Sequence, residues 1–231
     1  MSTRAALVAL ALGVSLLATA CGGPDVSIAP GRAGDSGAIR LDGVEVRQYK
    51  GERLDSVNDF RENSIKGVQR IEADAYKLTV DGLVKSPKTY AYSQVTSGFP
   101  AYEKVVQLDC VEGWSAKVLW RGVLLSDILD ASGVDPSANT VVFRAADGYS
   151  SSLPLAYLRD NDILLAYRMN GVTLPEERGF PFQVVAEDRW GYKWVKWVTG
   201  IEVTDDPAFR GYWESRGYSN SGKRDKNYYG D

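Results

Sequence analysis

The pattern of apolar and polar positions predicts a β-rich domain with few helices. Short segments that alternate or are continuously apolar, bounded by turn residues, are typical of strands. Apolar residues recur at helical spacing in one segment, Val123 to Ala131, which stops before Gly133 and should be a short helix. Asp81-Gly82 and Asn170-Gly171 mark turns. The expected strands are Tyr76 to Val84, broken at Asp81-Gly82, and Lys104 to Leu108, Thr140 to Ala145, Ile163 to Met169, Phe182 to Ala186 and Tyr192 to Val203. With no internal repeat and no second linker, one α+β domain is expected.

The first 20 residues show a different pattern, with one mostly apolar run in place of alternation. Ala5 to Ala20 is a continuous apolar run that follows Arg4 and ends in small residues before Cys21. At about 16 residues it is shorter than the roughly 20 that a spanning helix needs. Residues 1–20 resemble a bacterial lipoprotein signal peptide, with Cys21 lipidated. An ordinary secretory leader cleaved nearby is the alternative.

Residues 21–45 are rich in Gly, Pro, Ser and Asp without periodicity, which predicts a flexible tether. Residues 46–231 then form the folded domain. Lipid on Cys21 would hold this domain at the cell membrane, on the extracytoplasmic face.

Composition narrows the possible chemistry. A hydrophobic content of 44% excludes general disorder, and a net charge of −3 without a basic stripe gives no reason to expect nucleic acid. The chain has no histidine, which excludes Ser-His-Asp and Cys-His catalysis and most common zinc and non-haem iron sites. Phosphate-loop motifs are also missing from the sequence.

The two cysteines then stand apart. With Cys21 taken by lipid, Cys110 has no disulfide partner. An exposed thiol outside the cytoplasm oxidises or forms mixed disulfides. Cys110 is therefore either buried and inert or bound through its sulfur.

Several signatures occur in a characteristic order around this cysteine. They are CVEGWS from Cys110, Trp120-x-Gly122-x-x-Leu125, Asp147-Gly148-Tyr149, and the segments 58–62, 170–185, 189–203 and 211–220. Taken together they resemble the molybdopterin-binding domain of the sulfite oxidase superfamily, and within it the catalytic subunit of bacterial periplasmic protein-methionine-sulfoxide reductase. The resemblance covers roughly residues 55–220 and implies a sulfite-oxidase-type fold in a single α+β domain.

The resemblance implies a molybdenum-molybdopterin cofactor whose metal takes one sulfur from Cys110 as thiolate. Tyr149 and Arg178 would line substrate access, and Trp114 would face substrate, whereas most other tryptophans are expected in the core. The implied cofactor contacts are Asn58, Arg61, Glu62, Lys193 and Lys196.

These cofactor contacts have plainer alternatives. The lysines would be solvated if they lie on an edge strand, and Asn58 would instead cap a helix. In a regular strand Lys193 and Lys196 face opposite ways, so a bulge or turn is needed for both to reach a phosphate.

Arg61 replaces a tyrosine of the family, and three further positions also depart from the family pattern. Ala145 stands where the family has a threonine, Gln183 where it has an arginine, and Arg178 where it has an asparagine. Arg178 would restore the charge that is missing at Gln183.

The resemblance favours an enzyme that transfers an oxygen atom from a small S-oxide or N-oxide. The sequence has neither histidine nor a CxxCH motif for haem, so electrons would come from a separate membrane or soluble partner. A sulfite-oxidising enzyme is a second possibility, disfavoured because no basic substrate pocket is visible. A cofactor-free ligand-binding or assembly lipoprotein is a third. Ala145 and Gln183 favour it, as does a leader without the twin arginines that exported molybdopterin proteins generally carry.

Overall fold

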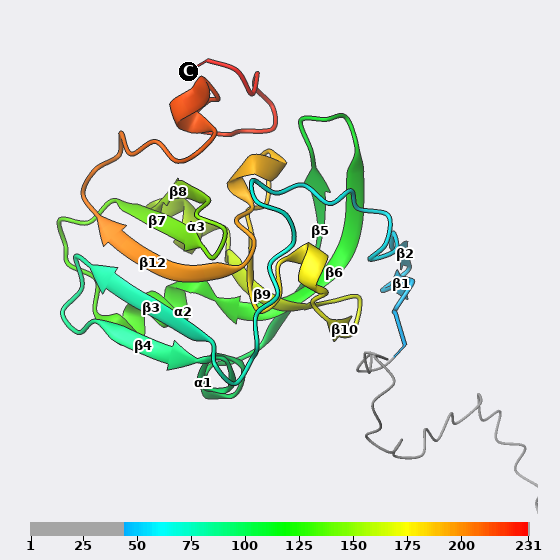
Figure 1. The fold of residues 1–231 in the computed structure, drawn as a ribbon, viewed down its shortest axis with the longest axis horizontal. Coiled ribbons are helices and arrows are strands. Elements are labelled where there is room, and N and C mark those ends of the chain that lie inside the picture. Colours follow the sequence, from blue (N-terminus) through cyan, green and yellow to red (C-terminus); the bar gives the residue numbers. More distant parts are fainter. Residues whose placement is uncertain (1–43, 231) are drawn as a thin grey trace, which may run out of the picture. The chain divides into compact units, whose positions relative to one another are not determined.

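The computed structural model describes residues 44–230, which belong to one compact unit. Two five-stranded sheets and a few short helices build it (Figure 1). The predicted signal peptide, Cys21 and nearly all of the predicted tether lie outside the described residues. From residue 44 to residue 230, no helix has the length and apolar character needed to cross a membrane.

The first sheet is antiparallel and has the strand order β10-β9-β6-β5, with β11 pairing along β9. Its longest hairpin joins β5 to β6, and Asp109 pairs with Ser115 at the closed end. The Cys110 turn therefore lies at the tip of this hairpin. The strands are β5 (Tyr102–Asp109), β6 (Ser115–Leu124), β9 (Leu164–Met169), β10 (Val172–Thr173) and β11 (Gln183–Val185).

The second sheet has the order β4-β3-β12-β7-β8. Its central strand β12 runs parallel to β3 and antiparallel to β7, and Figure 1 shows it between them. The strands are β3 (Lys77–Gly82), β4 (Lys88–Ala91), β7 (Thr140–Ala145), β8 (Ser150–Pro154) and β12 (Val198–Thr204).

Short helices connect the strands. The predicted helix is α2 (Leu125–Ser132), which follows β6 directly and is capped by Gly133, whose φ of 69° is left-handed. The other helices are α1 (Tyr92–Gly98) and α3 (Leu155–Asp160), with the 3-10 turns η1 (Glu176–Arg178), η2 (Gly191–Lys193) and η3 (Glu214–Arg216). A small hairpin, β1 (Gln48–Tyr49) with β2 (Glu52–Arg53), precedes them.

One hydrophobic core joins the two sheets. Val106 of β5 and Leu165 of β9 belong to the same buried cluster as Phe143 of β7 and Ile201 of β12. Burial of each such side chain contributes about 1.5–3 kcal/mol, so the core holds both sheets in place around the β5–β6 turn.

The predicted strands are confirmed with two corrections. The turn was expected at Asp81-Gly82, but Gly82 is the last residue of β3. The turn lies after it, between β3 and β4. Tyr192 to Val203 is not one strand: β12 starts only at Val198, after η2 and a residue with positive φ, Trp197. Helices α1 and α3 are short and were not predicted.

Candidate active site

Cys110 lies in the tight turn at the tip of the β5–β6 hairpin. Its backbone N–H donates to the carbonyl of Trp114 at 2.9 Å, and its carbonyl accepts from Gly113 at 3.0 Å. Gly113 has φ of 85°, a left-handed conformation that favours glycine. The turn therefore fixes the position of the sulfur through backbone contacts, and the residue is 9% exposed.

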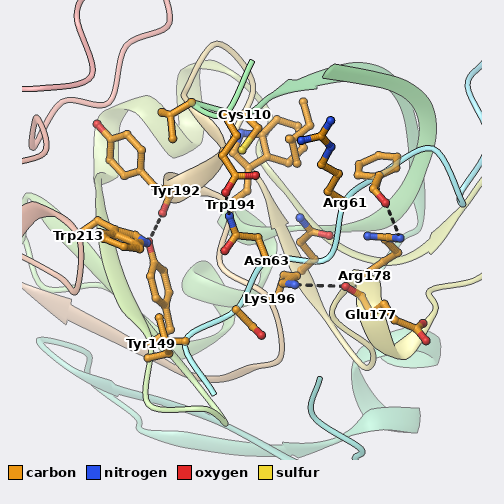
Figure 2. A pocket seen from close by; sticks show the side chains of 18 of the residues that line it. Arg61, Asn63, Cys110, Tyr149, Glu177, Arg178, Tyr192, Trp194, Lys196 and Trp213 are labelled. Atoms are coloured by element: carbon orange, nitrogen blue, oxygen red, sulfur yellow. Dashed lines mark hydrogen bonds between the residues drawn. The ribbon is translucent and has the colours of Figure 1, made fainter. Parts of the chain in front are cut away.

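The cysteine lines a cavity of about 300 Å³, a size at the lower end of small-molecule sites. Figure 2 shows Cys110 at one side of it and Lys196, Arg178 and Tyr149 at others. Six further segments complete the wall: residues 60–65, the β7–β8 turn, η1, β11 with Gln183, residues 191–197 and the C-terminal segment with Trp213 and Tyr218.

Burial raises the pKa of the Cys110 thiol, and the charge of Glu112 raises it further. The nearby backbone N–H groups of Glu112 and Val111 and the charge of Arg61 oppose this shift. Without another positive charge the group is a neutral thiol, and a bound metal ion would hold it as the thiolate.

Arg178 acts on the backbone of a neighbouring segment. Its Nε donates to the carbonyl of Val57 at 3.1 Å and its Nη2 to that of Phe60 at 2.9 Å. The guanidinium also lies 5.3 Å from the centre of the Phe60 ring. Arg178 thus holds the segment that brings Arg61 to the cavity wall.

Lys196 extends toward the cavity and is joined to Glu62. Its Nζ lies 3.1 Å from Glu62 Oε1, donates to the carbonyl of Glu177 at 3.2 Å, and lies 4.2 Å from the ring centre of Trp197 (Figure 2). Burial lowers the pKa of Lys196, and the charge of Glu62 opposes that shift. Glu62 itself does not line the cavity but orients a residue that does.

Tyr149 lines the cavity with its hydroxyl already committed. The hydroxyl donates to the carbonyl of Tyr192 at 2.5 Å, and Asp147 Oδ1 accepts from the Tyr149 backbone N–H at 2.9 Å. Burial raises the pKa of Tyr149 well above its ordinary value, so the phenol is neutral. Its ring serves as a fixed wall between the β7–β8 turn and η2.

Besides Glu62, two more of the predicted cofactor contacts do not line the cavity. Lys193 is fully buried and its Nζ is 2.7 Å from Glu214 Oε1. Asn58 is exposed in a turn where no helix begins, which also removes the helix-capping alternative. Neither lines the cavity, so their positions give no support to a contact with a cofactor there.

Other cavity residues were missed by sequence reasoning. Trp213 was assigned to the core by default but lines the cavity, as do Tyr218 and Asn63. Glu112 also lines it, and its place two residues after Cys110 was the available signal. Among the three further departures from the family pattern, Gln183 and Arg178 both line the cavity, whereas Ala145 does not.

Comparisons with known proteins define the class. Residues 65–213 match the family described as oxidoreductase molybdopterin binding domain, and the chain belongs to this family. It is therefore an oxidoreductase of the molybdopterin-dependent class, which confirms the predicted enzyme class, cofactor and superfamily.

Particular relatives refine this picture. The chain is 37% identical to the uncharacterized oxidoreductase YuiH of Bacillus subtilis over 62% of this chain and 72% of that protein. It is 33% identical to the putative protein-methionine-sulfoxide reductase subunit YedZ1 of Azospira oryzae, over 66% and 57%. The crystal structure of the sulfane dehydrogenase SoxCD from Paracoccus pantotrophus superposes with a TM-score of 0.60 at 25% identity, over 67% of this chain and 43% of that one.

The residues present fit a molybdopterin cofactor. Within residues 44–230, Cys110 is the one unpaired cysteine, and no three His, Cys, Asp or Glu side chains are grouped to hold a metal on their own. A single thiol on the wall suits a metal whose other sulfur ligands come with its cofactor. Lys196, on the same cavity, is the type of cation that binds a cofactor phosphate.

Proposed function

We propose that this protein is a lipid-anchored, extracytoplasmic molybdenum oxidoreductase that reduces small S-oxides or N-oxides. The observation that carries the proposal is the Cys110 thiol on the wall of a cavity that Arg178 and Lys196 also line. A ligand for the metal and a cation for a phosphate, Lys196, thus lie on the wall of one cavity.

Each of these residues has a defined part in holding the cofactor. Cys110 would supply its thiolate to the metal, and Lys196 would bind the phosphate, oriented by Glu62. Arg61 lines the cavity beside them and is a further contact for the cofactor's polar groups. When bound, the cofactor supplies a metal that changes oxidation state by two electrons as one oxygen atom is transferred.

The remaining side chains form the cavity wall and exclude water from the site. The half-buried rings of Trp114, Trp213 and Tyr218 line the cavity and exclude water from the space next to Cys110. Tyr149 keeps its proton in the bond to the Tyr192 carbonyl, so its part is to hold the wall. Arg178 contributes by fixing the backbone at Val57 and Phe60.

Reduction of an oxide is favoured over oxidation of sulfite. The cavity wall carries as many carboxylates as cations, whereas a sulfite site needs an excess of positive charge. The relative from Azospira oryzae, whose printed name is a protein-methionine-sulfoxide reductase subunit, supports the same direction. The wall cations are Arg61, Arg178 and Lys196, and the wall carboxylates are Glu112, Asp147 and Glu177.

Location and electron supply are inferred from the sequence. The apolar run before Cys21 supports a lipoprotein signal and attachment to the membrane. With no histidine and no CxxCH motif, the sequence supports electron delivery by a separate membrane or soluble partner.

Metal content tests the proposal directly. The full chain is produced in a host that makes molybdopterin, and molybdenum is measured in the wild type and in Cys110→Ser. We expect stoichiometric molybdenum in the wild type, its loss in the variant, and wild-type reduction of dimethyl sulfoxide or trimethylamine N-oxide with reduced viologen. Undiminished molybdenum in a folded Cys110→Ser variant would overturn the assignment of the ligand.

The same experiment addresses a second candidate, a cofactor-free binding or assembly lipoprotein. Gln183, buried on the cavity wall where the family has an arginine, favours it. A wild-type protein that contains no molybdenum after production in the competent host would support that candidate.

A further inference from the structure

Glu112 is a carboxylate held in place on the cavity wall beside Cys110. Its Oε1 accepts from Asn63 Nδ2 at 2.9 Å, and its Oε2 accepts from Trp114 Nε1 at 3.2 Å. One donor comes from the segment before the first sheet and the other from the Cys110 turn itself. Two hydrogen bonds from separate segments fix a side chain that is otherwise exposed.

The charge near the sulfur is balanced. Arg61 and Glu112 both line the cavity that Cys110 lines, and they carry opposite charges. The other two cations of the wall are engaged elsewhere, Arg178 with two backbone carbonyls and Lys196 with Glu62. A ligand at the Cys110 end therefore meets one positive and one negative group.

This balance distinguishes classes of ligand. An oxyanion such as sulfate or sulfite beside Cys110 would lie next to the Glu112 carboxylate, and like charges at close range repel each other. An uncharged oxide carries only a dipole, so its oxygen can accept from Arg61 while its alkyl groups contact Trp114, Trp213 and Tyr218. The fixed Glu112 carboxylate therefore lowers the binding affinity for an oxyanion more than it lowers the affinity for a neutral oxide.

We infer that Glu112 is the specificity-determining residue of the site, because it excludes oxyanions from the Cys110 end of the cavity and leaves it selective for uncharged S-oxides or N-oxides. The inference deepens the proposed function and rests on it for the reaction. The selection by charge is a property of binding and is measured separately.

The test uses two tetrahedral probes that differ in charge, sulfate and dimethyl sulfone. Binding to the molybdenum-loaded full chain is followed by tryptophan fluorescence, because Trp114 and Trp213 line the cavity. Glu112→Gln keeps an amide oxygen that accepts one of the two hydrogen bonds. We expect it to tighten sulfate binding about tenfold, and to change dimethyl sulfone binding by less than about twofold.

Two further variants serve as controls. One changes the length of the Glu112 side chain and keeps its charge, and the other changes the net charge of the protein by the same amount outside the cavity. Glu112→Asp keeps the carboxylate and should bind sulfate as weakly as the wild type. Glu103 lies on β5, outside the cavity, and forms an exposed ion pair with Arg121 of β6. Glu103→Gln removes an equal charge there and should match the wild type with both probes. In steady-state assays of dimethyl sulfoxide reduction, Glu112→Gln should lower the inhibition constant of sulfate about tenfold, whereas Glu103→Gln should leave that constant at its wild-type value.

The outcomes are distinguishable from those that test the proposed function. Unchanged or undetectable sulfate binding in Glu112→Gln, at wild-type thermal stability and molybdenum content, would overturn the role of Glu112 even if oxides are reduced. Tighter sulfate binding in a protein that reduces no oxide would leave the charge selection standing and overturn the reaction.

Discussion

Lys193 and Glu214 form an ion pair in which both side chains are completely buried, with Nζ 2.7 Å from Oε1. Lys193 also donates to the carbonyl of Asn220 at 3.0 Å, and Ser151 donates its hydroxyl to the same Glu214 oxygen. The pair joins η2, β8 and the C-terminal segment. Tyr192 and Trp213 directly precede these two residues in the chain, and both line the cavity. The ion pair therefore fixes the positions of two sides of the cavity wall.

Breaking this pair should destabilise the protein strongly. Lys193→Met leaves the Glu214 carboxylate buried without its counterion, and the expected loss is about 3–5 kcal/mol in the free energy of unfolding. Urea denaturation measures it. Lys117→Met, which breaks an exposed pair with Glu52, should cost about 1 kcal/mol or less. Equal losses in the two variants would contradict the structural role of the buried pair.

Gly113→Ala should disturb the Cys110 turn through backbone conformation alone. Nothing lies within 4 Å of a Cβ added at Gly113, but its φ is 85°, so we expect a loss of about 1–2 kcal/mol. Gly98→Ala is the matched control, because Gly98 is equally open, has no positive φ and ends helix α1. Thermal unfolding of the two variants compares them, and an unaffected Gly113→Ala variant would show that the turn tolerates a side chain.

The Cys110 thiol should react slowly at neutral pH in metal-free protein. Burial raises its pKa, so alkylation by iodoacetamide should reach its half-maximal rate above about pH 8.5, the value of an ordinary thiol. The unfolded chain then ionises first as the pH rises, and stability decreases above that pH relative to Cys110→Ser. A half-maximal rate below pH 8 in the folded protein would contradict this prediction.

Removal of the Lys196 charge should weaken cofactor binding. A charge-assisted hydrogen bond contributes about 1.5–3 kcal/mol, so Lys196→Met should lower affinity for molybdopterin at least tenfold. Molybdenum content after reconstitution of metal-free protein at limiting cofactor measures the effect. Lys117→Met controls for the loss of one positive charge, and equal metal content in the two variants would remove Lys196 from the binding site.

The strands were predictable where local pattern and tertiary environment agree. Thr140 to Ala145 was expected from its apolar run before a turn, and β7 has these bounds. The alternation from Tyr192 to Trp197 has another cause. Trp194 packs on Trp120 with ring centres 5.7 Å apart, while Trp197 donates from Nε1 to the carbonyl of Glu176. Each of these aromatic residues is buried by a different neighbour. The alternation of apolar and polar residues therefore has the period of a strand although the segment is not one.

The candidate site was predictable only as far as the family resemblance reached. Cys110 and Lys196 were named from matching motifs and Arg178 as a departure from the family pattern, and all three line the cavity. The place of Lys193 depends on Glu214, which follows it by 21 residues, and that of Glu112 depends on Asn63, 49 residues before it. Sequence patterns of short period carry no information on contacts at such separations.

The walls of the cavity are contributed by residues from Phe60 to Tyr218, and this span sets an order of events during biosynthesis. A growing polypeptide that has reached only β12 lacks Trp213 and Tyr218, so one side still stands open to water. Enclosure of a cofactor by these walls therefore requires translation to continue past Tyr218, far beyond the hairpin that carries Cys110.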